Sequence, residues 1–84
     1  MNFLEAAEKV KTLQNKPSNE ELLRLYSLYK QATCGDCDTE RPSFWNYIAA
    51  SKWNVWDELR GISRVRAEEL YVKLVEDLVS RDTK

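Results

Sequence analysis

Residues 18–33, with the sequence SNEELLRLYSLYKQAT, decide the fold class of this chain. Ser18 and Glu21 have the spacing of a capping box, in which each side chain accepts a hydrogen bond from the backbone N–H of the other residue. The apolar residues that follow recur at three- and four-residue steps, as one face of a helix requires: Leu22, Leu25 and Tyr29. The stretch is therefore predicted to be an amphipathic helix, whose pattern fades over residues 33–36.

Another helix is predicted over residues 3–13, before this stretch. Its apolar residues return to one face at helical spacing, and Asn2 and Glu5 form a second capping-box pair. The sequence Asn15-Lys16-Pro17 ends it, because proline cannot continue a helix.

Two more helices are predicted after a polar connection from Asp36 to Pro42. The third helix extends to Leu59 and Gly61 marks its end, but residues 44–48 fit either its first turns or an irregular aromatic loop. The fourth helix begins after Ser63, which is its predicted cap. Its apolar residues form one stripe and a second ridge: Ala67, Leu70, Tyr71, Leu74 and Leu78, then Val72, Val75 and Val79. The four segments predict an all-α bundle of four helices.

The composition agrees with long helices and excludes several classes of protein. The 84 residues fit a single domain, 1–84, and two Gly with two Pro are too few for many short strands and tight turns. The chain has 13 basic and 14 acidic residues, a net charge of −1, so no overall field attracts nucleic acid. Histidine is absent, which excludes histidine-based catalytic triads, HExxH zinc proteases and Cys2His2 fingers.

Signals for secretion or membrane insertion are missing from the sequence. No window approaches the about 18 apolar residues that a membrane span needs. The first residues, 1–5, lack the basic and apolar regions of a signal peptide. We therefore expect a cytoplasmic protein without stable membrane insertion.

Cys34-Gly35-Asp36-Cys37 forms a C-x-x-C motif. Such a motif is typical of a redox pair or of half a metal site. No second C-x-x-C and no histidine completes four ligands here, and no alternating strand and helix pattern surrounds it. We interpret both cysteines as small apolar packing residues and expect no metal site.

Acidic residues occur as adjacent pairs on predicted helices, so their side chains diverge instead of converging on one pocket: Glu20-Glu21, Asp57-Glu58, Glu68-Glu69 and Glu76-Asp77. This predicts that the chain is not an enzyme.

Aromatic and basic residues lie close together in two places, Tyr26-x-x-Tyr29-Lys30 and Lys52-Trp53. Rings beside ammonium groups suit a planar anionic ligand such as a nucleotide, although periodicity alone favours a place for the rings in the core.

Three short stretches resemble the acyl-CoA-binding proteins, a family of the diazepam-binding-inhibitor type. They are Tyr26-Ser27-Leu28-Tyr29-Lys30-Gln31-Ala32-Thr33 with Gly35-Asp36, then Thr39 to Pro42, then Lys52-Trp53-Asn54-Val55-Trp56. The resemblance implies an up-down-down-up bundle of four helices. It also implies a monomeric intracellular carrier or buffer that binds medium- to long-chain fatty acyl-CoA without catalysis and without a cofactor.

The resemblance also implies roles for individual residues. Tyr29 matches the position that lies against the adenine, and Lys30 matches the one that reaches the ribose 3′-phosphate. Lys52 matches a second phosphate-contacting lysine, and Tyr71 matches the tyrosine that closes the nucleotide site. The remaining expected contacts are a lysine of the first helix and residues inside the tyrosine motif: Lys11, Tyr26, Ser27 and Leu28.

Departures from the family pattern leave an alternative open. Ile48 and Ala50 stand where basic residues are common, which removes phosphate attraction if those positions are exposed. The aromatic residues Phe44, Trp45 and Tyr47 could instead enlarge an apolar wall for the acyl chain. The same features also fit a protein-interaction module of this descent with weakened ligand binding. Cys34 stands where valine is common in the family, which agrees with a packing role.

Overall fold

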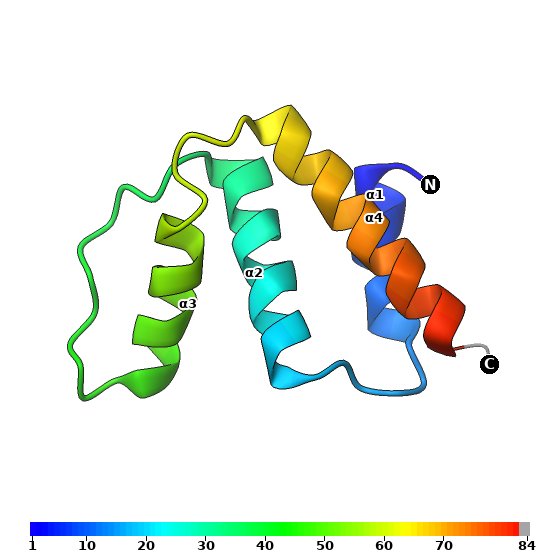
Figure 1. Ribbon diagram of the computed structural model, residues 1–84, viewed down its shortest axis with the longest axis horizontal. Helices are drawn as coiled ribbons and strands as arrows, with labels where there is room; N and C mark the ends of the chain where they lie inside the picture. The colour runs from blue at the N-terminus through cyan, green and yellow to red at the C-terminus, as the bar shows by residue number, and fades with distance from the viewer. Residues whose placement is uncertain (83–84) are drawn as a thin grey trace.

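The computed structural model describes residues 1–82 and is built from helices alone over that range (Figure 1). The elements are α1 (Phe3–Lys9), a short 3-10 helix η1 (Val10–Thr12), α2 (Asn19–Cys34), α3 (Tyr47–Asp57) and α4 (Arg64–Asp82). Figure 1 shows α2 and α3 running side by side in one direction and α1 and α4 running in the other. The predicted up-down-down-up arrangement of an all-α bundle is confirmed.

Both predicted capping boxes are formed. Asn2 Oδ1 accepts a hydrogen bond from Glu5 N at 2.8 Å, and Asn2 N donates to Glu5 Oε1 at 3.0 Å. The corresponding distances between Ser18 and Glu21 are 3.2 and 2.9 Å. Ser63 Oγ accepts from Arg66 N at 3.0 Å, as its predicted role as a cap requires.

The first helix is shorter than predicted. Its α-helical part ends at Lys9, and residues 10–12 continue as a single 3-10 turn before Leu13 becomes extended. The apolar spacing does not distinguish the two geometries over so short a segment, because 3.0 and 3.6 residues per turn keep nearby side chains on one face.

The third helix begins at Tyr47, with Asn46 as its cap, so residues 44–46 belong to the preceding connection. That connection covers residues 35–46, and its length follows from topology. Because α2 and α3 are parallel neighbours, the connection between them must run back along the full length of α3, which is about 16 Å at 1.5 Å per residue.

Side chains of α3 and of the turn after it hold this connection in place. Trp56 Nε1 donates to the carbonyl oxygen of Gly35 at 2.9 Å, and Trp53 Nε1 donates to that of Thr39 at 3.0 Å. An Arg60 guanidinium nitrogen donates to the Cys37 carbonyl oxygen at 2.7 Å. Backbone groups that have no helical partner are thereby satisfied, and a segment without periodicity acquires a fixed path.

The main core lies where α2 meets α4 and where α4 meets α1. Its buried members come from these three helices: Ala6, Leu25, Leu28, Tyr71, Val75 and Leu78. Val75 is fully buried, although the sequence placed it on a second ridge of the fourth helix, whereas Leu70 and Leu74 are only partly buried. The buried stripe follows the 67, 71, 75 and 78 positions, because α4 packs against both α1 and α2.

Candidate functional site

A groove of about 530 Å³ opens between α2, the connection and α3. We call it the lysine groove, because Lys30 and Lys52 both line it. Tyr26, Trp53 and Trp56 are among its walls, and the remaining lining residues are smaller or aliphatic: Thr39, Pro42, Asn46, Ile48 and Ala49.

The two lysines of this groove rest on aromatic rings. Lys30 Nζ lies 4.8 Å from the centroid of the Trp56 ring, and Lys52 Nζ lies 5.2 Å from that of Tyr26. Both distances fall within the range of cation–π attraction. Neither ammonium group forms a salt bridge with a carboxylate of residues 1–82. The groove therefore presents two positive charges that are held in position and available to an anion.

A second groove, of about 340 Å³, lies between η1, the start of α2 and α4. We call it the tyrosine groove, because Tyr26, Tyr29 and Tyr71 line it. The rest of its lining is mainly apolar, with one lysine: Val10, Lys11, Pro17, Leu22 and Leu25. Tyr26 lines both grooves, so they adjoin at its ring.

Three aromatic rings pack together beside the tyrosine groove. The Phe3 centroid lies 5.7 Å from that of Tyr29 and 5.1 Å from that of Tyr71, and the two tyrosine centroids are 6.0 Å apart. Burial, with a smaller contribution from Tyr29, raises the pKa of the Tyr71 hydroxyl. A tyrosine hydroxyl is protonated at neutral pH in any case, so Tyr71 is able to donate a hydrogen bond.

Six of the eight residues expected from the sequence line these grooves: Lys11, Tyr26, Tyr29, Lys30, Lys52 and Tyr71. Ser27 and Leu28 line neither groove, because their side chains turn into the bundle. Ser27 Oγ donates to the Arg24 carbonyl oxygen at 2.9 Å, and Leu28 belongs to the buried core. Lys11 pairs with Glu8 at 3.5 Å on the exposed face.

Several groove residues were not singled out from the sequence as ligand contacts, and for two of them, Trp56 and Leu22, the sequence contains a signal. Trp56 follows Lys52 by four residues, and Leu22 precedes Tyr26 by four. Residues four apart share one face of a helix, so each lies beside a residue that was singled out.

The cysteines occupy different environments, which corrects part of our interpretation. Cys37 is buried with 2 % of its surface exposed, whereas Cys34 is exposed at the last turn of α2. The packing role therefore belongs to Cys37 and not to Cys34. Both thiols are free, and residues 1–82 contain no cluster of three cysteine or acidic side chains suited to a metal ion.

The residues that depart from the family pattern also lie in different environments. Ala50 is buried, with 8 % of its surface exposed, so our expectation of an exposed lost charge applies to Ile48 alone. Ile48 lines the lysine groove, whereas Phe44, Trp45 and Tyr47 line neither groove. The three rings therefore do not extend the groove wall in this structure.

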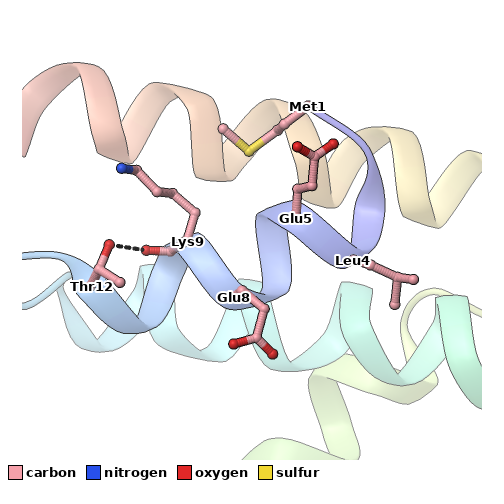
Figure 2. Close-up of a pocket in the computed structure, with 6 residues that line it drawn as sticks. All are labelled: Met1, Leu4, Glu5, Glu8, Lys9 and Thr12. Carbon is pink, nitrogen blue, oxygen red and sulfur yellow. Dashed lines mark hydrogen bonds between the residues drawn. The ribbon is translucent and has the colours of Figure 1, made fainter.

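A larger hollow, of about 590 Å³, lies over the outer face of α1 (Figure 2). Figure 2 shows Glu5, Glu8 and Lys9 around it, with Leu4 at one end. Two carboxylates against one ammonium and no aromatic ring make it a poor site for a nucleotide, and it shares no residue with the two grooves.

Comparison with known proteins shows to which family the chain is similar. The profile of the family described as Acyl CoA binding protein matches residues 1–75. Acyl-CoA-binding protein homolog 1 of Caenorhabditis elegans is 44% identical over 81 residues, which cover 96% of this chain and 94% of that protein. The acyl-CoA-binding protein of Saccharomyces cerevisiae is 47% identical over 79 residues, covering 94% and 91%.

Solved structures show the same fold. The crystal structure of Oryza sativa acyl-CoA-binding protein 2 superposes with a TM-score of 0.93 at 41% identity, covering 98% of this chain and 89% of that one. The solution structure of the yeast protein gives 0.76 at 45% identity, with 98% and 95% covered. The chain belongs to the acyl-CoA-binding protein family.

Proposed function

We propose that this protein binds medium- to long-chain fatty acyl-CoA thioesters across the two adjoining grooves and serves as a carrier and buffer for them. The observation that carries the proposal is the position of Lys30 and Lys52, whose ammonium groups form no salt bridge within residues 1–82. Both line the lysine groove, which adjoins the tyrosine groove at Tyr26. Charged phosphates and an apolar chain need such a combination of cationic and apolar walls.

Within this arrangement each part of the ligand has its own set of residues. The adenine lies against Tyr29 in the tyrosine groove, which Tyr71 closes and which Lys11 borders. Lys30 takes the ribose 3′-phosphate and Lys52 takes a second phosphate. The acyl chain follows the aliphatic wall of the lysine groove: Pro42, Ile48 and Ala49.

The chain is a binding protein and not an enzyme, as its family and its named relatives indicate. Binding divides into two physical contributions. Each buried methylene contributes up to about 0.8 kcal/mol, and each charge-assisted hydrogen bond to phosphate about 1.5–3 kcal/mol. Ordering the flexible ligand reduces the total.

We further infer that the protein acts as a monomer in the cytoplasm. None of the helices within residues 1–82 is long and apolar enough to cross a membrane. Both cysteines are free, as is usual in a reducing compartment. The alternative of an interaction module without ligand gains no support from the family relationship, since the relatives named above are acyl-CoA-binding proteins.

Titration calorimetry with acyl-CoA of eight to sixteen carbons tests the proposal. Eight added methylenes give at most ~6 kcal/mol, and we expect clearly less because the groove is open and the chain loses freedom. Ile48→Ser should reduce the gain with chain length while leaving the weak binding of free CoA, the control, unchanged. A dissociation constant that stayed flat across the series, or equal to that of free CoA, would contradict burial of the chain.

A further inference from the structure

Four large apolar side chains are exposed together where the connection meets α3. This aromatic patch consists of Phe44, Trp45, Tyr47 and Ile48, whose exposed fractions are 72, 83, 81 and 71%. The three rings alone present on the order of 400 Å² to solvent, since an aromatic side chain carries about 150–250 Å². This is the size of the largest apolar patch on a typical monomeric protein, and such a patch is often functional.

The backbone under the aromatic patch is fixed by hydrogen bonds. Ser43 Oγ accepts from Trp45 N at 3.3 Å, and Asn46 N donates to the Ser43 carbonyl oxygen at 2.9 Å. Asn46 Oδ1 accepts from Ala49 N at 3.3 Å and caps α3. The Phe44 and Trp45 rings pack on each other, with centroids 4.6 Å apart. The exposed rings therefore project from a turn whose backbone is held by hydrogen bonds.

The chemistry of the aromatic patch suits a lipid surface. Trp and Tyr combine an apolar ring with a polar group, and both favour the boundary between headgroups and acyl chains. The patch lies between Arg41 and Lys52, and no acidic residue occurs from residue 41 to residue 56, although Glu40 directly precedes this segment. Although the chain as a whole has a net charge of −1, this segment carries only basic charges and is therefore compatible with anionic headgroups.

The shape of the region also favours a lipid surface. Figure 1 shows the start of α3 and the adjoining connection at a free edge of the molecule, away from α1 and α4. Phe44, Trp45 and Tyr47 line none of the described hollows, so these three rings protrude from the surface instead of lining a concave site. Protruding rings of this kind insert readily into a headgroup layer.

We propose that the aromatic patch docks this protein on anionic lipid surfaces, with the Phe44 and Trp45 rings in the headgroup region. The patch is continuous with the lysine groove, because Ile48 belongs to both and Asn46 lines the groove. Insofar as the function proposed above holds, docking brings the groove mouth to the membrane. An acyl chain then passes between bilayer and groove with less exposure to water.

Flotation of the ligand-free, full-length protein with vesicles tests this docking. The vesicles are phosphatidylcholine alone or phosphatidylcholine with about a quarter phosphatidylserine, the latter giving the anionic surface. We expect the wild type to float with the anionic vesicles, and a Phe44→Ser/Trp45→Ser variant to lose at least ~tenfold in bound fraction. A Leu4→Ser/Val65→Ser variant, which removes two other largely exposed apolar side chains from α1 and α4, should bind like the wild type.

A second readout does not depend on the double variant. Brominated phosphatidylcholine in the anionic vesicles should quench the wild-type tryptophan fluorescence more strongly than that of Trp45→Phe, because Trp45 is the exposed tryptophan of the patch. Palmitoyl-CoA affinity without vesicles should stay within about twofold in the patch variant, since neither ring lines a groove.

The proposal is overturned if the wild type floats with neither vesicle, which would leave the patch to a protein partner or a second copy. It is equally overturned if the patch variant floats like the wild type, or if that variant loses palmitoyl-CoA affinity without vesicles, which would assign the rings to the ligand. Patch-dependent flotation of a protein that failed to bind acyl-CoA would instead uphold docking and reject the proposed carrier function.

Discussion

Lys30 and Lys52 enter the same groove from different helices and differ in exposure. Lys30 is half-buried over Trp56, whereas Lys52 is exposed over Tyr26. Solvent screens a half-buried charge less, so we expect Lys30→Ala to weaken palmitoyl-CoA binding more than Lys52→Ala does. A loss of about 1.5–3 kcal/mol for Lys30→Ala corresponds to roughly 10- to 100-fold in dissociation constant by calorimetry.

Lys73→Ala is the matched control for the lysine variants. It removes the same charge from an exposed position of α4 that lines neither groove, and it should leave the affinity unchanged within about twofold. Both groove variants should remain as helical as the wild type, since alanine is a good helix former. Wild-type affinity of Lys30→Ala at physiological salt would contradict the assignment of the phosphate site.

The two cysteines give a second comparison between single residues. Cys37→Ala removes a buried sulfur and should lower the free energy of unfolding by about 1 kcal/mol or more in urea denaturation. Cys34→Ala changes an exposed side chain and should cost less than about 0.5 kcal/mol. Both should bind palmitoyl-CoA within a factor of a few, and an equal loss of stability in the two variants would contradict the observed difference in burial.

The family resemblance, and not the periodicity, singled out Tyr26, Tyr29 and Lys30, since periodicity alone favoured a place for the rings in the core. All three line a groove, and their contact with a ligand stays a prediction. The burial of Ala50 and the exposure of Cys34 could not be predicted in the same way. Both depend on how the connection returns along α3, and that path is set by contacts far apart in the chain.

Among the elements, the connection between α2 and α3 is held at its start by one carboxylate. Asp36 Oδ1 accepts from Gly61 N at 2.9 Å and from Gln31 Nε2 at 2.8 Å. The Gly61 hydrogen bond is the main cause that lowers the pKa of Asp36, and the Gln31 hydrogen bond adds to it. Gln31 Nε2 also donates to the Ile62 carbonyl oxygen at 2.7 Å, so the end of α2 is tied to the turn before α4.

This arrangement gives a pH dependence of stability with a definite sign. Because the pKa of Asp36 is lower in the folded state, its contribution is present above the unfolded value of about 4 and is lost as the pH falls below it. We expect the difference in unfolding free energy between wild type and Asp36→Asn to be constant near neutral pH and to shrink in acid.

Urea denaturation at a series of pH values measures the Asp36 difference. Asp77→Asn, which changes an exposed carboxylate of α4, serves as the control. A difference that grew on acidification would contradict the sign given above.

At the level of elements, helix positions were predictable and helix directions were not. Capping boxes and apolar spacing are local, and they located the starts of α1 and α2. The parallel pairing of α2 and α3 is a property of the whole chain, and only the family resemblance implied it. The tryptophan and arginine hydrogen bonds that fix the connection link residues 14 to 23 positions apart and leave no periodic signal.

The whole molecule is a flat body of about 39 × 28 × 16 Å in which α3 stands at one edge. Among the helices, α3 packs against α2 alone, whereas α1, α2 and α4 share the central core. One wall of the lysine groove belongs to α2, which is part of the central core. The other belongs to α3, which packs against α2 alone.

The difference in packing between α3 and the core helices has a consequence for hydrogen exchange. Backbone amides of α3 should exchange through local opening well before those of α2 and α4, which open only with the core. If the opened form cannot hold ligand, palmitoyl-CoA at about 100 times its dissociation constant should slow α3 exchange by roughly 100-fold. Mass spectrometry of exchanged peptides measures this. Amides of α3 that were as protected as those of α2 and α4 without ligand, or α3 exchange that the ligand left unchanged, would argue against it. Detachment of one edge helix would then set the rate at which the cargo leaves.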